Sequence, residues 1–65
     1  MTDWQERVIN EKDELDAKLL KLRAFIGGPT FTGLCREDQY LLTKQVGIMS
    51  EYFTLLALRI ERFTP

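Results

Sequence analysis

The chain has 65 residues, a formal net charge of −1, no histidine and a single cysteine, Cys35. A chain of this length forms one domain with a marginal core, and its composition argues against an intrachain disulfide or a structural zinc site, so we expect oligomerisation to stabilise it. The near-neutral charge argues against a DNA or RNA polymer or a membrane surface as partner.

The first predicted element is a helix over about residues 3–26. This segment contains no glycine or proline, and its apolar residues recur at helical spacing. They are Trp4, Val8, Leu15, Leu19, Leu22 and Ile26. Thr2 or Asp3 is the expected N-cap. Because most other positions are charged, one face of this helix should be buried and the rest should be exposed to solvent.

A joint follows over residues 27–35, with the sequence GGPTFTGLC. Glycine accepts unusual φ values and proline presets φ, so the joint is typical of a turn. Its turn-forming residues are Gly27, Gly28, Pro29 and Gly33. A turn does not require Thr30, Phe31 and Thr32, whose hydroxyls and ring would suit a phosphate and a base. The alternative is a plain connection in which Phe31 closes the end of the core.

The last predicted element is a helix over about residues 36–63, weakly capped by Cys35. An uninterrupted apolar seam runs along it, formed by Leu42, Val46, Met49, Phe53, Leu56, Ile60 and Phe63. A second seam contains Leu41, Gln45, Ile48, Tyr52, Leu55, Arg59 and Arg62. A third consists of small residues, Thr43, Gly47, Ser50, Thr54 and Ala57. The first helix can cover only one seam, so we expect the others to form a subunit interface; the alternative is a partly exposed face of a loose hairpin.

These elements predict an all-α fold. The whole chain, residues 1–65, should form a single two-helix antiparallel hairpin with at most a short extra N-terminal turn, assembling into a compact homo-oligomer. The beginning MTDWQERV lacks the basic and apolar regions of a secretory signal, and no apolar run is long enough to cross a bilayer. We therefore expect a soluble, cytosolic, reduced protein.

The sequence does not favour an enzyme. Without histidine, neither a Ser-His nor a Cys-His nucleophilic pair can form. Gly28 and Gly33 have the spacing of a phosphate-binding loop, but Leu34 and Cys35 stand where lysine and a hydroxyl residue are required. The carboxylates of the first helix lie among lysines, as on a solvated surface. We expect no catalytic residue, no metal and no cofactor.

The order and spacing of several motifs resemble the small phage anti-CBASS proteins that act as cyclic-nucleotide sponges. The motifs are E-R-V-x-x-E-K-x-E-L-D at 6–16, A-F-I at 24–26, the aromatic residue in the joint, L-L-x-x-Q at 41–45, M-x-x-Y at 49–52 and L-x-x-R-I at 56–60. The resemblance implies a helical hairpin that forms homo-hexamers in the cytoplasm of an infected bacterium. It also implies binding of cyclic dinucleotides, and in some members cyclic trinucleotides, which are sequestered without cleavage.

The resemblance places a cyclic dinucleotide at a junction between protomers. In the joint, the matching residues are Thr30 and Thr32, on either side of Phe31. Thr30 stands where members often carry lysine, so Arg7 of the first helix is expected to supply the missing cation. The ligand-binding set is completed by two residues that suit a base edge, Asn10 and Glu11. The alternative for Glu11 is a wet position at the edge of the apolar stripe.

A second, trinucleotide site implied by the resemblance involves an arginine near the C-terminus. Arg59 is the matching residue, with Arg62 next. The alternative is that both are surface charges that interact with the helix dipole. A competing function for the whole chain is a small oligomeric adaptor that docks a protein partner, with Tyr52, Phe53 and Arg59 as anchors.

Overall fold

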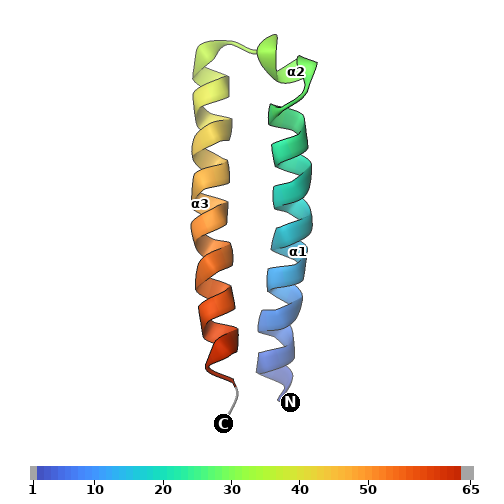
Figure 1. Ribbon diagram of the computed structural model, residues 1–65, viewed down its shortest axis with the longest axis vertical. Coiled ribbons are helices and arrows are strands. Elements are labelled where there is room, and N and C mark those ends of the chain that lie inside the picture. Colours follow the sequence, from blue (N-terminus) through green and yellow to red (C-terminus); the bar gives the residue numbers. More distant parts are fainter. Residues whose placement is uncertain (1, 64–65) are drawn as a thin grey trace.

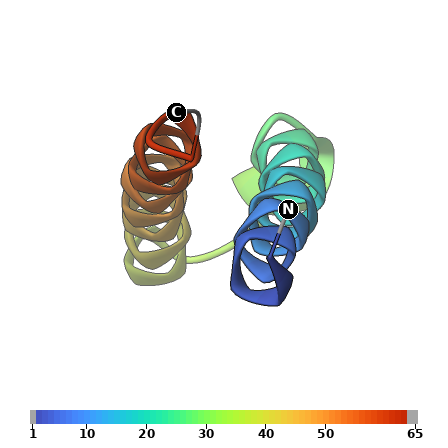
Figure 2. The same ribbon diagram turned by 90° about the horizontal axis from the view of Figure 1, so that it is seen from below.

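The computed structural model describes residues 2–63, which form three α-helices: α1 (Asp3–Ile26), α2 (Pro29–Thr32) and α3 (Arg36–Glu61). The two long helices run antiparallel and α2 lies in the connection between them (Figure 1). Seen along the hairpin, α1 and α3 lie side by side as one layer (Figure 2). The principal-axis extents are 49 × 15 × 14 Å, so the chain is a long, narrow hairpin.

The predicted all-α hairpin is confirmed, with one correction in the joint. Helix α1 has the predicted bounds, and α3 begins at Arg36 as expected but ends at Glu61, followed by a turn through Phe63. The extra turn lies in the joint, as α2, and not at the N-terminus. Pro29 occupies the first turn of α2, where its fixed φ suits a helix and its missing N–H costs no hydrogen bond.

The glycines of the joint do not supply unusual φ values, which corrects the sequence-based expectation. Gly27, Gly28 and Gly33 have φ of −78°, −96° and −83°, all within the range open to other residues. Gly28 lies close to the end of α1 instead. A Cβ added there would lie 3.4 Å from the carbonyl oxygens of Ala24 and Phe25, at the short limit of ordinary van der Waals contact. The glycine therefore leaves a little room where the chain departs from α1.

Hydrogen bonds cap the start of α1 and join α2 to α3. The predicted N-cap Thr2 is confirmed, and its backbone N–H donates to Gln5 Oε1 at 3.1 Å, as in a capping box. Cys35 is the N-cap of α3 but makes no side-chain capping bond. Gln39 of α3 donates through Nε2 to the carbonyl oxygen of Phe31 at 2.9 Å. This bond holds α2 against the start of α3.

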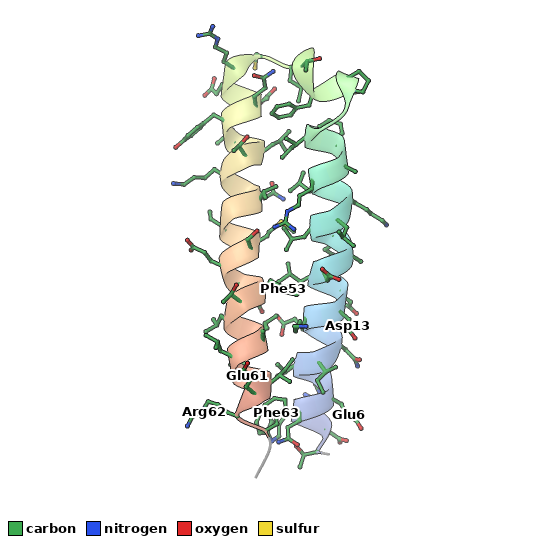
Figure 3. The ribbon with its side chains drawn as sticks, in the orientation of Figure 1. Glu6, Asp13, Phe53, Glu61, Arg62 and Phe63 are labelled. Atoms are coloured by element: carbon green, nitrogen blue, oxygen red, sulfur yellow. The ribbon has the colours of Figure 1, made fainter. Side chains whose placement is uncertain are left out.

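A small apolar core lies between α1 and α3. Its buried side chains among the described residues are Val8, Leu15, Leu19 and Leu56. Partly buried side chains pack against them from α3 and the turn that follows it, namely Val46, Met49, Phe53, Ile60 and Phe63. These α3 residues belong to the uninterrupted seam predicted from the sequence, so that seam does face α1. Figure 3 shows Phe53 and Phe63 directed into the space between the helices.

Three specific contacts join the two long helices outside the aliphatic core. Lys12 Nζ lies 4.6 Å from the centre of the Phe53 ring, which is a cation–π distance. Lys12 is half-buried, so it does not lie on a fully solvated face as the sequence pattern indicated. Near the joint, Arg23 Nη2 donates to Ser50 Oγ at 2.8 Å. At the opposite end of the hairpin, the rings of Trp4 and Phe63 meet edge-on, with centroids 5.1 Å apart.

Much of α3 remains exposed. Leu41, Ile48 and Leu55 of the second seam are 56%, 58% and 53% exposed, so α1 leaves these residues of the second seam uncovered. The accessible surface of the chain is 5167 Å², whereas a compact folded monomer of this mass averages about 4300 Å². None of the helices within residues 2–63 combines the length and apolar character needed to cross a membrane.

Candidate functional site

The joint places two threonine hydroxyls at the closed end of the hairpin. Thr30 and Thr32 lie on α2 and both are exposed. Thr32 Oγ1 donates to the carbonyl oxygen of Pro29 at 2.7 Å, so its proton is already used and its oxygen remains an acceptor. The Thr30 hydroxyl makes no hydrogen bond within residues 2–63. Thr30 is therefore the better donor for a ligand at this end.

Phe31 lies between the two threonines and is half-buried. Its carbonyl oxygen accepts from the Leu34 N–H at 3.1 Å and from Gln39 Nε2 at 2.9 Å. These bonds fix the backbone that carries the ring. Phe31 is thus held in a defined position at the closed end, with part of its side chain exposed.

The candidate residues of α1 lie far from the joint within one chain. Arg7, Asn10 and Glu11 are exposed residues in the first half of α1. At 1.5 Å per residue, the axial distance from Glu11 to Ile26, where α1 ends, is about 22 Å. A single chain therefore does not bring these residues together with Thr30 and Thr32. Glu11 is exposed to solvent. This agrees with the alternative of a solvated position at the edge of the apolar stripe, and it also leaves the carboxylate accessible to a ligand.

The two candidate arginines of α3 do come together, at the open end of the hairpin. A depression of about 400 Å³ lies there, lined by Trp4, Gln5, Arg59, Arg62 and Phe63. The side chain of Arg62 points away from α1 (Figure 3). Arg59 and Arg62 are both exposed, and Trp4 is 53% exposed. Two cations and an accessible aromatic surface therefore share one depression.

Sequence reasoning missed three residues of this depression: Trp4, Gln5 and Phe63. Trp4 and Phe63 were assigned to the apolar stripes of their helices, which accounts for their packing but not for their position beside the arginines. A usable signal was present, because two antiparallel helices of similar length with a short joint bring the first residues beside the last. Pairing Trp4 with Phe63 at the outset would have located the depression.

The side chains that line the depression at the open end offer guanidinium donors, an amide and an indole surface. Arginine guanidinium groups donate several hydrogen bonds in a planar array that matches phosphate oxygens. An exposed indole offers a stacking surface for any base. Gln5 Oε1 accepts a hydrogen bond from the Thr2 backbone N–H, which leaves the donors of the Gln5 amide nitrogen unused by that bond.

Neither end contains a recognisable metal centre. Among residues 2–63, no group of three or more histidine, cysteine, aspartate or glutamate side chains is arranged to hold a metal ion. Cys35, between α2 and α3, is an exposed free thiol. The polar groups at the two ends include hydroxyl, amide and guanidinium groups together with carboxylates, Asp3 and Glu6 at the open end and Glu37 and Asp38 at the closed end.

Comparison with known proteins agrees with the resemblance found in the sequence motifs. The model of the family described as Sequestin matches residues 2–62, which is nearly the whole chain and includes both ends of the hairpin. No characterised protein and no solved structure matched. The chain therefore belongs to the Sequestin family, whose name denotes sequestration.

Proposed function

We propose that this protein is a phage anti-defence protein that binds and sequesters cyclic oligonucleotide second messengers, and so blocks CBASS immune signalling in the cytoplasm of the infected bacterium. The observation that carries the proposal is the Sequestin match over residues 2–62. The sequence motifs that resemble the cyclic-nucleotide sponges supply the class of ligand. The exposed hydroxyl and guanidinium groups at the two ends of the hairpin are chemically suited to it.

The proposed cyclic dinucleotide site lies between protomers of a homo-oligomer, with a hexamer as the expected assembly. The axial separation of about 22 Å between Glu11 and the end of α1 prevents one chain from forming the site alone. When the closed end of one protomer lies beside the first half of another protomer's α1, Thr30 and Arg7 can face the phosphates. Asn10 and Glu11 then face the base edges, and Phe31 offers a stacking surface.

The proposed cyclic trinucleotide site lies at the open end. Arg59 and Arg62 bind phosphates there, and Trp4 stacks on a base. All of these residues line one depression of a single chain. This site consequently depends less on residues from other protomers than the dinucleotide site does.

The proposed mechanism is sequestration without chemistry. Cleaving a phosphodiester requires an activated nucleophile and a group that protonates the leaving oxygen. The chain has no histidine, and the groups proposed to face the phosphates are hydroxyls and guanidiniums, which donate hydrogen bonds but are poor bases. The protein lowers the free messenger concentration by tight binding alone, and the ligand should be released unchanged on denaturation.

A thermal-shift panel of cyclic dinucleotides and cyclic trinucleotides tests the proposal. A ligand present at 100 times its Kd should stabilise the folded state by about 2.7 kcal/mol and raise Tm visibly. The matched control for each ligand is its linear counterpart with the same bases. Failure of every cyclic nucleotide to raise Tm would contradict the proposal.

The exposed seam of α3 supports a second candidate function, the adaptor module. Ile48 and Leu55 are more than half exposed, and apolar side chains of this kind commonly mark a protein interface. An adaptor would not respond to any cyclic nucleotide in the thermal-shift panel. The same measurement therefore distinguishes the two functions.

A further inference from the structure

The side chains around the depression at the open end are hydrogen-bond donors. The depression is lined by Trp4, Gln5, Arg59, Arg62 and Phe63. The indole of Trp4 and the guanidinium groups of both arginines donate and do not accept, and the Phe63 side chain has no polar atom. Neither the indole nor the two guanidinium groups make a hydrogen bond within residues 2–63. A ligand in this depression therefore meets several unused donors.

Gln5 adds further donors because the start of α1 holds its amide in one orientation. Gln5 Oε1 accepts a hydrogen bond from the Thr2 backbone N–H at 3.1 Å, as part of the capping box. Turning the amide over would place its nitrogen against that N–H and lose the bond. The N–H groups of Gln5 Nε2 make no hydrogen bond with the described part of the chain. The capping bond thus determines which end of the amide is left to donate.

Acceptor groups at this end are engaged or lie outside the lining. The carbonyl oxygens of Arg59 and Ile60 accept the N–H groups of Arg62 and Phe63, at 3.2 and 2.9 Å. The carboxylates of the first turn of α1 and the last residue of α3 are not among the lining residues, namely Asp3, Glu6 and Glu61. The side-chain acceptor in the described lining is Gln5 Oε1, which the Thr2 N–H already engages. A ligand group that must donate is poorly matched here.

We infer that Gln5 determines the base specificity of the open-end site, and that it selects bases with an acceptor-only edge, guanine or hypoxanthine, over adenine. This role rests on the proposed trinucleotide site and adds to it the residue that reads the base. The base stacks on the exposed indole of Trp4. Arg59 and Arg62 hold the phosphates, and Gln5 Nε2 donates to the edge of the stacked base.

The two purines differ at the edge that Gln5 reads. Guanine presents O6 and N7, which both accept, whereas adenine presents N7 beside an N6 amino group, which donates. Against the donors of the depression, the amino group of adenine loses its hydrogen bond to water and gains no partner. Discrimination then comes from the unpaired group on the wrong base as well as from the bond to the right one.

Cyclic triinosinate and cyclic triadenylate form the matched pair of ligands for the test. Hypoxanthine keeps O6 and N7 of guanine but lacks its 2-amino group, so the two ligands differ chiefly at the edge in question. Trp4 is the only tryptophan of the chain, and quenching of its fluorescence therefore reports a base stacked at the open end. Both ligands should quench it, and the Kd of cyclic triinosinate should be about tenfold lower than that of cyclic triadenylate.

Gln5→Glu removes the donors and keeps the cap. A capping box accepts glutamate in place of glutamine, so the carboxylate still accepts the Thr2 N–H and Tm should not fall. The new acceptor suits the amino group of adenine and not O6. Both ligands should bind more weakly because of the added negative charge, and the tenfold preference should vanish or turn toward adenine. Gln45→Glu, the same change at an exposed position of α3 outside the depression, is the control and should keep the preference.

The role of Gln5 and the proposed function fail on different results. Equal Kd values for the two ligands in the parent, or an unchanged preference in Gln5→Glu, would overturn the role of Gln5 and leave sequestration standing. Binding seen by calorimetry without quenching of Trp4 would place the ligand elsewhere and overturn that role in the same way. If no cyclic nucleotide binds at all, the proposed function is contradicted and the role of Gln5 is lost with it.

Discussion

The two ends of the hairpin are built differently. At the closed end, α2 is fixed by side-chain hydrogen bonds to its backbone and offers hydroxyl groups, and the exposed Arg36 begins α3 four residues after it. At the open end, no covalent connection exists, and an edge-on contact of Trp4 and Phe63 holds the helices together beside two arginines. In the proposed function, the closed end contributes hydroxyl groups to a site shared between chains, whereas the open end contributes two guanidinium groups and a stacking surface from one chain. Ligand selectivity between dinucleotide and trinucleotide should follow this difference.

The largest expected effect is loss of the folded hairpin, which would abolish the arrangement of both ends at once. Leu56 is completely buried at the centre of the core, and truncation of a buried leucine to alanine costs about 2 to 5 kcal/mol of folding free energy. Since so small a core is marginal, Leu56→Ala should lose most of its cooperative thermal unfolding by circular dichroism. Leu20→Ala, at a site that is 59% exposed on α1, is the matched control and should change stability by less than about 0.5 kcal/mol. Equal Tm values for the two variants would contradict the position of the core.

The next largest effect should be confined to the open end of the hairpin. The double variant Arg59→Ala/Arg62→Ala should lower cyclic trinucleotide affinity by at least about a hundredfold, because it removes at least two charge-assisted hydrogen bonds worth about 1.5 to 3 kcal/mol each. Cyclic dinucleotide affinity should stay within about twofold of the parent. Isothermal titration calorimetry with both ligands checks this. An equal loss for the two ligands would show that the ends do not act as separate sites.

The long elements of the fold could be predicted from the sequence, and the short one could not. The spacing of Val8, Leu15 and Leu19 determines the buried face of α1, and the absence of glycine and proline determines its length. In α2, one turn begins at Pro29 and is held by the bond from Gln39, a contact between residues eight apart that no helical period reveals. The glycines were misread because glycine signals both unusual φ and close approach, and only coordinates separate the two.

The candidate site was predictable in composition but not in arrangement. Arg59 and Arg62 were found from motif order, and the structure places them in one depression with Trp4. Sequence position alone did not show that the Thr32 hydroxyl donates to the carbonyl oxygen of Pro29, whereas the Thr30 hydroxyl makes no such bond. It also did not show that about 22 Å of α1 separates Glu11 from the joint.

A smaller effect sharpens the account of the closed end. Thr30→Val removes the hydroxyl proposed to face a phosphate, and losing a hydrogen bond of about 1 to 3 kcal/mol should weaken cyclic dinucleotide binding about tenfold to a hundredfold. The Tm of the free protein should not change, because this hydroxyl makes no hydrogen bond within residues 2–63. Thr32→Val should instead lower Tm slightly, since it removes the bond to Pro29. Parent-like dinucleotide binding by Thr30→Val would assign the closed end a purely structural role.

The smallest expected effect concerns Arg7. Arg7→Gln should weaken cyclic dinucleotide binding severalfold and flatten its dependence on salt, because an exposed charge acts through an interaction that ions screen. Lys18→Gln, also exposed on α1, is the control and should keep the parent's salt dependence. Binding measured between low and physiological ionic strength checks both variants. Identical slopes for Arg7→Gln and the parent would exclude Arg7 as the phosphate partner.

Equilibrium dialysis against a cyclic dinucleotide, followed by denaturation and chromatography of the recovered ligand, tests sequestration most directly. The account predicts that ligand is depleted from the free compartment in a fixed ratio to protein and is then recovered entirely as the cyclic dinucleotide. No depletion at micromolar protein would contradict binding, and recovery of linear dinucleotide or mononucleotide would contradict sequestration without cleavage.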